Sequence, residues 1–170
     1  MINKTAIEKY FIAEKQESLL FMIVGIAAVA LSVIAWQFWK TPGWKGAAIP
    51  LACIGLLQLT VGYTVYTRSD EQRVNMVYAL DMNPTKLVQE ELPRMQLVNK
   101  KFIVYRWVEV LLLLTGIVLA IVFLVNDDKR FIWGLGIALA VQAALMLGAD
   151  FFAERRAVAY TNQLAQLKEP

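Results

Sequence analysis

Two glutamines interrupt long apolar runs of this sequence, and they are its clearest candidates for polar chemistry. Gln58 follows Gly55 by three residues and precedes Gly62 by four, so on a helix it shares a face with small residues. Gln142 lies in a later apolar run, at nearly the same distance from the start of its run. An amide in apolar surroundings needs a hydrogen-bond partner. We therefore expect either a Gln58–Gln142 hydrogen bond, which we favour, or a polar path lined by both.

Ionisable residues lie nearer the ends of these runs. Glu109 follows Arg106 by three residues, a spacing that predicts an ion pair on one helix. Asp150 lies near the inner end of its run, with Arg155 and Arg156 just beyond it. An acid inside a membrane segment is a functional hypothesis by default, and Glu109 is the better candidate of the two. Its shallow position weakens the hypothesis, because the side chain can reach the interface.

Residue types that the sequence lacks exclude several kinds of chemistry. The chain has no histidine and a single cysteine, Cys53. This excludes Ser–His–Asp and Cys–His nucleophiles, histidine metal sites and disulfides within the chain. We found no glycine-rich phosphate loop. We expect no enzyme activity, no metal and no cofactor.

The elements that must position these residues are long apolar helices. The 170-residue chain is 58% hydrophobic, with a mean hydropathy of +0.50. At 1.5 Å per residue, a run of 22 residues is about 33 Å long, enough for a hydrocarbon layer of roughly 30 Å. Four such runs are predicted to span a membrane: 18–39, 46–67, 104–125 and 131–152.

The distribution of basic residues predicts the orientation of the spans. With the N-terminus in the cytoplasm, 13 of the 17 lysines and arginines fall inside and four outside. The predicted fold is an all-α, polytopic four-helix transmembrane bundle of two in–out–in hairpins. Both termini should be cytoplasmic, and a bacterial inner (plasma) membrane is the expected location. The basic pI of about 9.0 fits contact with membrane lipids and requires no nucleic acid.

Three segments outside the spans should be cytoplasmic: 1–17, 68–103 and 153–170. The first has helical apolar spacing and is either a helix on the membrane surface or simply the start of the first span. In the second, Asn83 and Pro84 predict the end of one helix and the start of another, and Pro93 predicts a kink or break.

Charged residues in the segment 68–103 are spaced for pairing on one helix face. Lys86–Glu90 and Glu90–Arg94 are each four residues apart. We interpret them as ordinary surface pairs.

Small residues predict where helices approach one another in a membrane, since lipid tails are as apolar as leucine. A weak internal repeat relates residues 9–26 to 100–117 and aligns Gly25 with Gly116; whether it reflects a true duplication stays open. The predicted packing glycines are Gly25, Gly55, Gly62, Gly116 and Gly148.

The expected function is that of a small membrane protein acting through protein contacts, as an accessory, assembly or toxin-immunity subunit, with a protein partner or as a homo-oligomer. The alternative is a small oligomeric channel or transporter with a polar path near Gln58, Gln142 and Glu109. In topology alone the chain resembles small multidrug transporters and immunity proteins against pore-forming toxins, and no residue roles follow from that.

Overall fold

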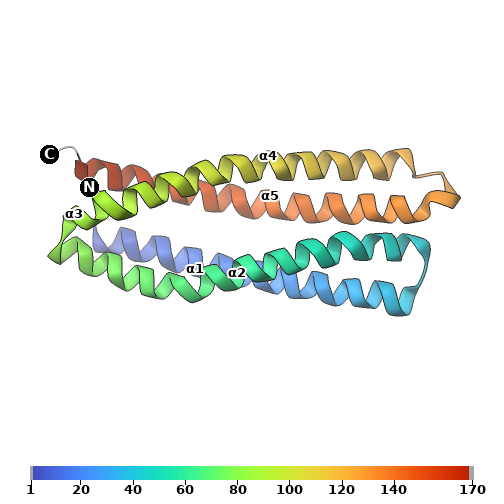
Figure 1. The fold of residues 1–170 in the computed structure, drawn as a ribbon, viewed down its shortest axis with the longest axis horizontal. Coiled ribbons are helices and arrows are strands. Elements are labelled where there is room, and N and C mark those ends of the chain that lie inside the picture. Colours follow the sequence, from blue (N-terminus) through green and yellow to red (C-terminus); the bar gives the residue numbers. More distant parts are fainter. Residues whose placement is uncertain (1, 169–170) are drawn as a thin grey trace.

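Four long helices make up most of the computed structural model, which describes residues 2–168 (Figure 1). No strand occurs in this range, which confirms the all-helical prediction. Short elements lie between the long helices and after the last one: the π-helical turns η1 (Ala35–Trp39) and η2 (Leu87–Glu91), the single turn α3 (Pro84–Lys86), and the 3₁₀ turns η3 (Asp127–Lys129) and η4 (Gln166–Lys168). The long helices are α1 (Lys4–Ile34), α2 (Pro42–Met82), α4 (Leu92–Val122) and α5 (Arg130–Ala165).

Each long helix extends beyond the 22 residues predicted to span a membrane. The longest, α2, has 41 residues, or about 62 Å at 1.5 Å per residue. All four are long and apolar enough to cross a membrane. The remainder of each helix carries most of the charged residues and forms a polar half of the molecule.

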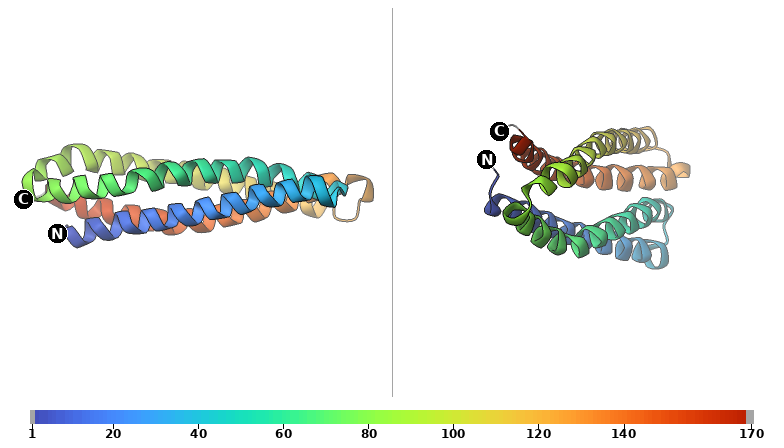
Figure 2. Two further views of the ribbon diagram at one scale, coloured as in Figure 1. Left: turned by 90° about the horizontal axis from the view of Figure 1, so that it is seen from below. Right: turned by 60° about the vertical axis from the view of Figure 1, so that its left-hand side comes forward.

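The helices form two hairpins that lie side by side. Both hairpin turns are at one end of the molecule, here called the turn end (Figure 1). The N-terminal residues, α3 and the C-terminal residues share the opposite end, here called the connector end. Figure 2 shows the α1–α2 hairpin and the α4–α5 hairpin as two stacked layers.

Local chemistry explains where the first hairpin begins and turns. Asn3 caps α1, its side chain accepting a hydrogen bond of 2.8 Å from the backbone N–H of Ala6. At the turn end, Lys40 adopts a left-handed conformation with φ of 52°, which ends the helix as a residue after a C-terminus often does. Pro42 then starts α2, where its missing N–H costs no helical hydrogen bond.

The prolines of the connector act as predicted at one site and differently at another. The chain leaves α2 at Asn83 and starts α3 at Pro84, which confirms the prediction for these two residues. Pro93 does not interrupt the helical run from η2 into α4. It lies in the first turn of α4, directly after the π-helical turn η2, and in a first turn a proline N–H would have no helical acceptor.

Residues 4–34 form one continuous helix, so the N-terminal segment runs directly into the first apolar stretch. Ile7, Tyr10 and Phe11 are buried in the protein at the connector end. They belong to a hydrophobic core built from all four long helices and η2. Its buried members also include Ile2, Met76, Ala79, Leu87, Leu92, Met95, Ala157, Tyr160 and Leu164. Of the predicted tail 153–170, residues 153–165 continue α5, and residues 169–170 lie outside the described range.

The hairpins contact each other mainly through α2 and α5, with a smaller contact between α1 and α5. Along its length α4 packs against α5, and in the described chain it makes no comparable contact with α1 or α2. Only 11% of its most apolar stretch is buried, against 28–33% for the other three helices. The surface of α4 that faces away from α5 is therefore mostly uncovered by other helices.

Glycines lie where the helices of each hairpin approach most closely. A Cβ on Gly25 would lie 2.7 Å from the carbonyl oxygen of Gly55. A Cβ on Gly116 would lie 2.5 Å from the backbone nitrogen of Ala140. Gly62 meets Ser18 and Met22 of α1 in the same way. Gly148 differs, because an added Cβ would meet no atom of the described chain within 4 Å.

These contacts predict opposite effects for two glycine substitutions in similar helices. Gly116→Ala should destabilise the protein by about 1–3 kcal/mol, because backbone atoms of α5 occupy the space that the methyl group needs. Gly148→Ala should be neutral or stabilising by up to about 1 kcal/mol, since alanine favours a helix. Thermal unfolding of both variants in the same detergent measures the difference. Equal losses would contradict the packing described for α4 and α5.

Candidate functional site

The two central glutamines meet between α2 and α5. The Gln58 amide donates to Oε1 of Gln142 over 3.5 Å, a long hydrogen bond. Both side chains are buried, with 1% and 2% of their surface exposed. This confirms the predicted contact and places it inside a single chain. Oε1 of Gln58 has no partner among the described residues, so the pair is only partly satisfied.

The second polar level contains Glu109 of α4 and Asp150 of α5. The contacts Arg106–Glu154 and Gly116–Ala140 on either side set the register of the two helices and put these acids at the same level, as neighbouring groups. Glu109 is 2% exposed, and its Oε2 has no hydrogen-bond partner in residues 2–168. The structure therefore brings together two acids that the sequence suggested only as separate candidates.

The arginines at this level pair with acids on other helices. Arg106 forms an ion pair with Glu154 of α5 and not with Glu109. Arg156 forms a two-pronged ion pair with Glu17 of α1 and not with Asp150. Spacing along one helix suggested the local pair Arg106–Glu109, but in the structure both guanidinium groups bind acids on other helices.

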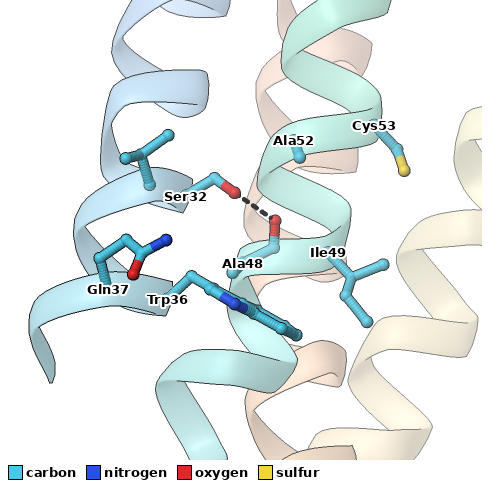
Figure 3. A pocket seen from close by; sticks show the side chains of 8 residues that line it. Ser32, Trp36, Gln37, Ala48, Ile49, Ala52 and Cys53 are labelled. Atoms are coloured by element: carbon cyan, nitrogen blue, oxygen red, sulfur yellow. Dashed lines mark hydrogen bonds between the residues drawn. The ribbon is translucent and has the colours of Figure 1, made fainter. Parts of the chain in front are cut away.

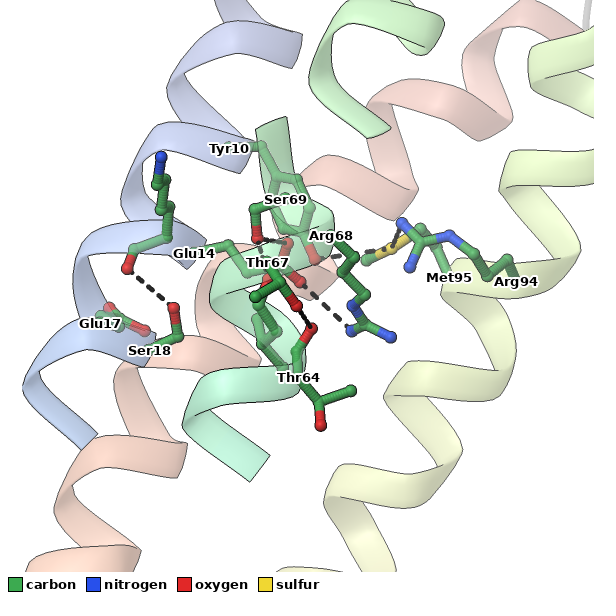
Figure 4. Close-up of polar contacts among 12 residues, drawn as sticks. Tyr10, Glu14, Glu17, Ser18, Thr64, Thr67, Arg68, Ser69, Arg94 and Met95 are labelled. Carbon is green, nitrogen blue, oxygen red and sulfur yellow. Dashed lines mark hydrogen bonds and ion pairs between the residues drawn. The ribbon is translucent and has the colours of Figure 1, made fainter. Parts of the chain in front are cut away.

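A polar cluster lies next to this level, at the connector end (Figure 4). Ser69 of α2 donates to Glu14 of α1 over 3.0 Å, and Arg68 approaches the same carboxylate at 3.9 Å. On the neighbouring surface Lys15 pairs with Asp70. That ion pair raises the pKa of Lys15 and lowers the pKa of Asp70 through the hydrogen bond between them. These contacts join α1 to α2 where the apolar half ends.

Glu91 and Arg94 form the most enclosed ion pair of the molecule's polar half. Two hydrogen bonds of 2.7 Å join them, and Glu91 is 4% exposed. Burial opposes the charge of Arg94, yet the carboxylate keeps its pKa above the usual value. Lys86 and Glu90 approach to 3.8 Å as predicted, whereas the predicted Glu90–Arg94 pair is wrong because Arg94 binds Glu91.

Two tyrosines lie beside this ion pair, and the sequence analysis did not single them out. The ring of Tyr10 stacks on that of Tyr160, with 4.2 Å between the ring centroids. The Tyr10 hydroxyl donates to the sulfur of Met95 over 3.6 Å. The Tyr160 hydroxyl is buried and has no hydrogen-bond partner in the described chain. Burial raises the pKa of both tyrosines well above the usual value. The helical spacing of apolar residues around Tyr10 is a sequence signal for this core, but it does not identify Tyr160 as the partner.

Near the turn end, a groove of about 410 Å³ lies between α1 and α2 (Figure 3). Ser32 donates to the carbonyl oxygen of Ala48 over 2.8 Å beside it, which joins the two helices. Trp36 and Cys53 are among its mostly apolar lining residues. A second hollow of about 380 Å³ lies between the two hairpin turns and is lined by Trp44 and Trp133, among others. Neither hollow is lined by Gln58, Gln142 or Glu109.

Within residues 2–168, no group of three or more acidic or cysteine side chains is placed to hold a metal ion. Comparison of the chain with protein-family models, curated proteins and solved structures finds no match. The fold and site define an all-helical protein with four helices able to cross a membrane and three polar levels between them. Its function has to be inferred from that geometry.

A double-mutant cycle tests whether the glutamines act as a pair. Gln58→Leu and Gln142→Leu should each destabilise, and the double variant should cost about as much as either single variant. The coupling energy should be about 0.5–2 kcal/mol. Reversible unfolding in detergent measures it. Ser32→Ala combined with Gln58→Leu is the control and should be additive, because Ser32 binds Ala48. Additive losses for the glutamines would show that each serves another contact.

The buried tyrosines predict the alkaline stability of the protein. Because the folded pKa of Tyr160 lies above the ordinary value of 10.0, stability is fully present below pH 10 and falls as pH rises above it. Tyr160→Phe should reduce this loss. At neutral pH it should cost nothing, or stabilise by up to about 1 kcal/mol, since the hydroxyl lacks a close partner. Unfolding measured across alkaline pH checks both effects, with Tyr10→Phe as the comparison. An alkaline loss that is unchanged in both variants would contradict this origin.

Proposed function

We propose that this protein is a multi-pass integral membrane protein that acts through contacts with another protein and catalyses no reaction. Its four long helices cross the membrane, with the connector end in the cytoplasm of a bacterium. In this role it is an accessory, assembly or toxin-neutralising subunit. The proposal draws on the connector end, where the molecule has most of its water-accessible surface.

The arrangement of the ends supports this orientation. Both hairpin turns are at one end, and both described termini and α3 are at the other. The basic residues are concentrated at the connector end, as expected for the cytoplasmic side. The turn end offers only short loops, so little of the protein would project from the opposite side.

One observation carries the proposal of a protein partner: an apolar stripe on the outer surface of α2. Val74, Tyr78 and Met82 are four residues apart, so they share one helix face. Their side chains are 60%, 65% and 67% exposed. We call these three residues the α2 stripe.

The α2 stripe lies beyond the lipid. Val74 is seven residues past Thr67, the end of the predicted span, which is about 10 Å along the helix, and Met82 is about 22 Å past it. The headgroup region adds only about 5–8 Å to each side of the hydrocarbon layer. Three large apolar side chains in water on one helix face are typical of a surface that receives a partner.

The channel or transporter alternative has less support. Gln58 and Gln142 are in contact and almost fully buried, so they close the interior of one chain and do not line a path through it. A path would have to form between several copies. Ion or solute flux in proteoliposomes that is lost in Glu109→Gln would support this alternative.

The α2 stripe can be removed without disturbing the core. The wild-type chain is cross-linked to its partner in native membranes. The variant Val74→Ser/Tyr78→Ser/Met82→Ser should no longer form this cross-link. The unfolding temperature should stay nearly unchanged, since these side chains are exposed. A deletion of residues 70–100 cannot test the interface, because it also removes core residues such as Met76, Leu87 and Met95.

Leu97→Ser is the matched control, since Leu97 is an exposed apolar residue of α4 at the same end. It should retain the partner. The mass of the purified complex separates a second copy of this chain from a different protein. Retention of the same partner by the triple variant would refute the α2 stripe as the interface.

A further inference from the structure

The acid pair Glu109–Asp150 is not balanced by a cation. Four acids and two arginines of α1, α4 and α5 lie at the inner end of the apolar half. Glu17 forms an ion pair with Arg156, and Glu154 forms one with Arg106. In the described chain no ion pair remains for Glu109 or Asp150, which are neighbours at the same level of α4 and α5.

The surroundings make two negative charges at this position costly. Glu109 is 2% exposed, and one of its oxygens is buried with no hydrogen-bond partner in the described chain. Neighbouring like charges repel more strongly where one of them is shielded from water. A proton shared between the two carboxyl groups would remove this repulsion.

We propose that Glu109 and Asp150 together bind one proton, and that this proton holds α4 against α5. The ligand is a hydrogen ion shared by two carboxyl oxygens, one from each helix. The pair is then a carboxylic acid that donates to a carboxylate, with a net charge of minus one. This site does not depend on the proposed protein partner.

The donor set fits a proton better than a metal ion. Within the described residues no three acidic side chains are placed to share a cation, whereas hard cations take about six oxygen ligands. A proton needs only two oxygens. The unpartnered, buried oxygen of Glu109 supplies an acceptor that no other group of the described chain uses.

Two fixed contacts flank the pair along α4. On the inner side, Arg106 binds Glu154 three residues before Glu109. On the outer side, Gly116 packs on Gly136 and Ala140, seven residues or about 10 Å beyond Glu109. Since α4 packs along its length only against α5, repulsion at Glu109 acts directly on this helix pair.

The direction of the pH effect follows from the groups that face the pair. These are Glu17 of α1, Arg106 of α4, and Glu154 and Arg156 of α5. The arginines keep their charge, and each stays with its own carboxylate. Raising the pH removes the shared proton, and the two carboxylates then repel each other. The contact between α4 and α5 is therefore stable at low pH and weakens at high pH.

Infrared difference spectroscopy of the full-length protein in lipid vesicles detects the proton directly. The wild-type protein should show the carbonyl band of a protonated carboxylic acid, which disappears as the pH is raised. The band should be lost or shifted in both Glu109→Gln and Asp150→Asn. Two variants are used so that one failure to fold does not decide the result. Glu154→Gln is the matched control, because that acid is ion-paired at the same level, and it should retain the band.

Unfolding temperature against pH provides an independent readout. The wild-type protein should lose stability when the shared proton is removed at rising pH, and Glu109→Gln should lose less, because its amide keeps a hydrogen bond at every pH. A band that persists unchanged in both Glu109→Gln and Asp150→Asn would overturn the proposal. Stability that follows sodium concentration at constant pH would overturn it in favour of a cation site.

Discussion

Close backbone approach at glycine sets the register on which the other contacts in this bundle depend. In an apolar medium, helices gain little from burying apolar side chains and associate through close packing and polar contacts. Gly25 against Gly55 fixes α1 on α2, and Gly116 against Gly136 fixes α4 on α5. A one-turn slip in either hairpin would move a polar side chain about 5 Å from its partner. The pair Arg106–Glu154 exists only because the second hairpin keeps this register.

The helix α5 carries one member of the main contact at each polar level. Gln142 meets α2, Asp150 and Glu154 meet α4, and Tyr160 stacks on Tyr10 of α1. Asp150 and Tyr160 are ten residues apart on this one helix, about 15 Å. A shift of α5 at the acid pair would therefore also move Tyr160 in the core at the connector end. The outer surface of α2, by contrast, carries the exposed stripe and faces no other helix.

The sequence predicts this fold well where one pattern dominates, and less well where partners compete. Uniform apolar runs predict four helices, and matched depth predicts the Gln58–Gln142 contact, because few other polar partners exist at that level. Near the connector end many charges lie within reach of one another. There Arg106 has both Glu109 and Glu154 available, and only the packing of α5 decides between them. The Tyr10–Tyr160 stack joins residues 150 positions apart and has no local signal.

The weak repeat aligns Gly25 with Gly116, and both glycines make the close contact of their own hairpin. Their helices nevertheless differ in surroundings, since α1 contacts α2 and α5 whereas α4 has only α5 along its length. Glu17 of the first half lies within one position of the residue that corresponds to Glu109, and it binds Arg156. On α1 this acid is held by an ion pair, whereas on α4 the ion pair is made by Arg106 and Glu109 lies in the acid pair. The helix α4, which has the fewest contacts along its length, is thus also the helix whose contact with α5 depends on a titratable acid pair.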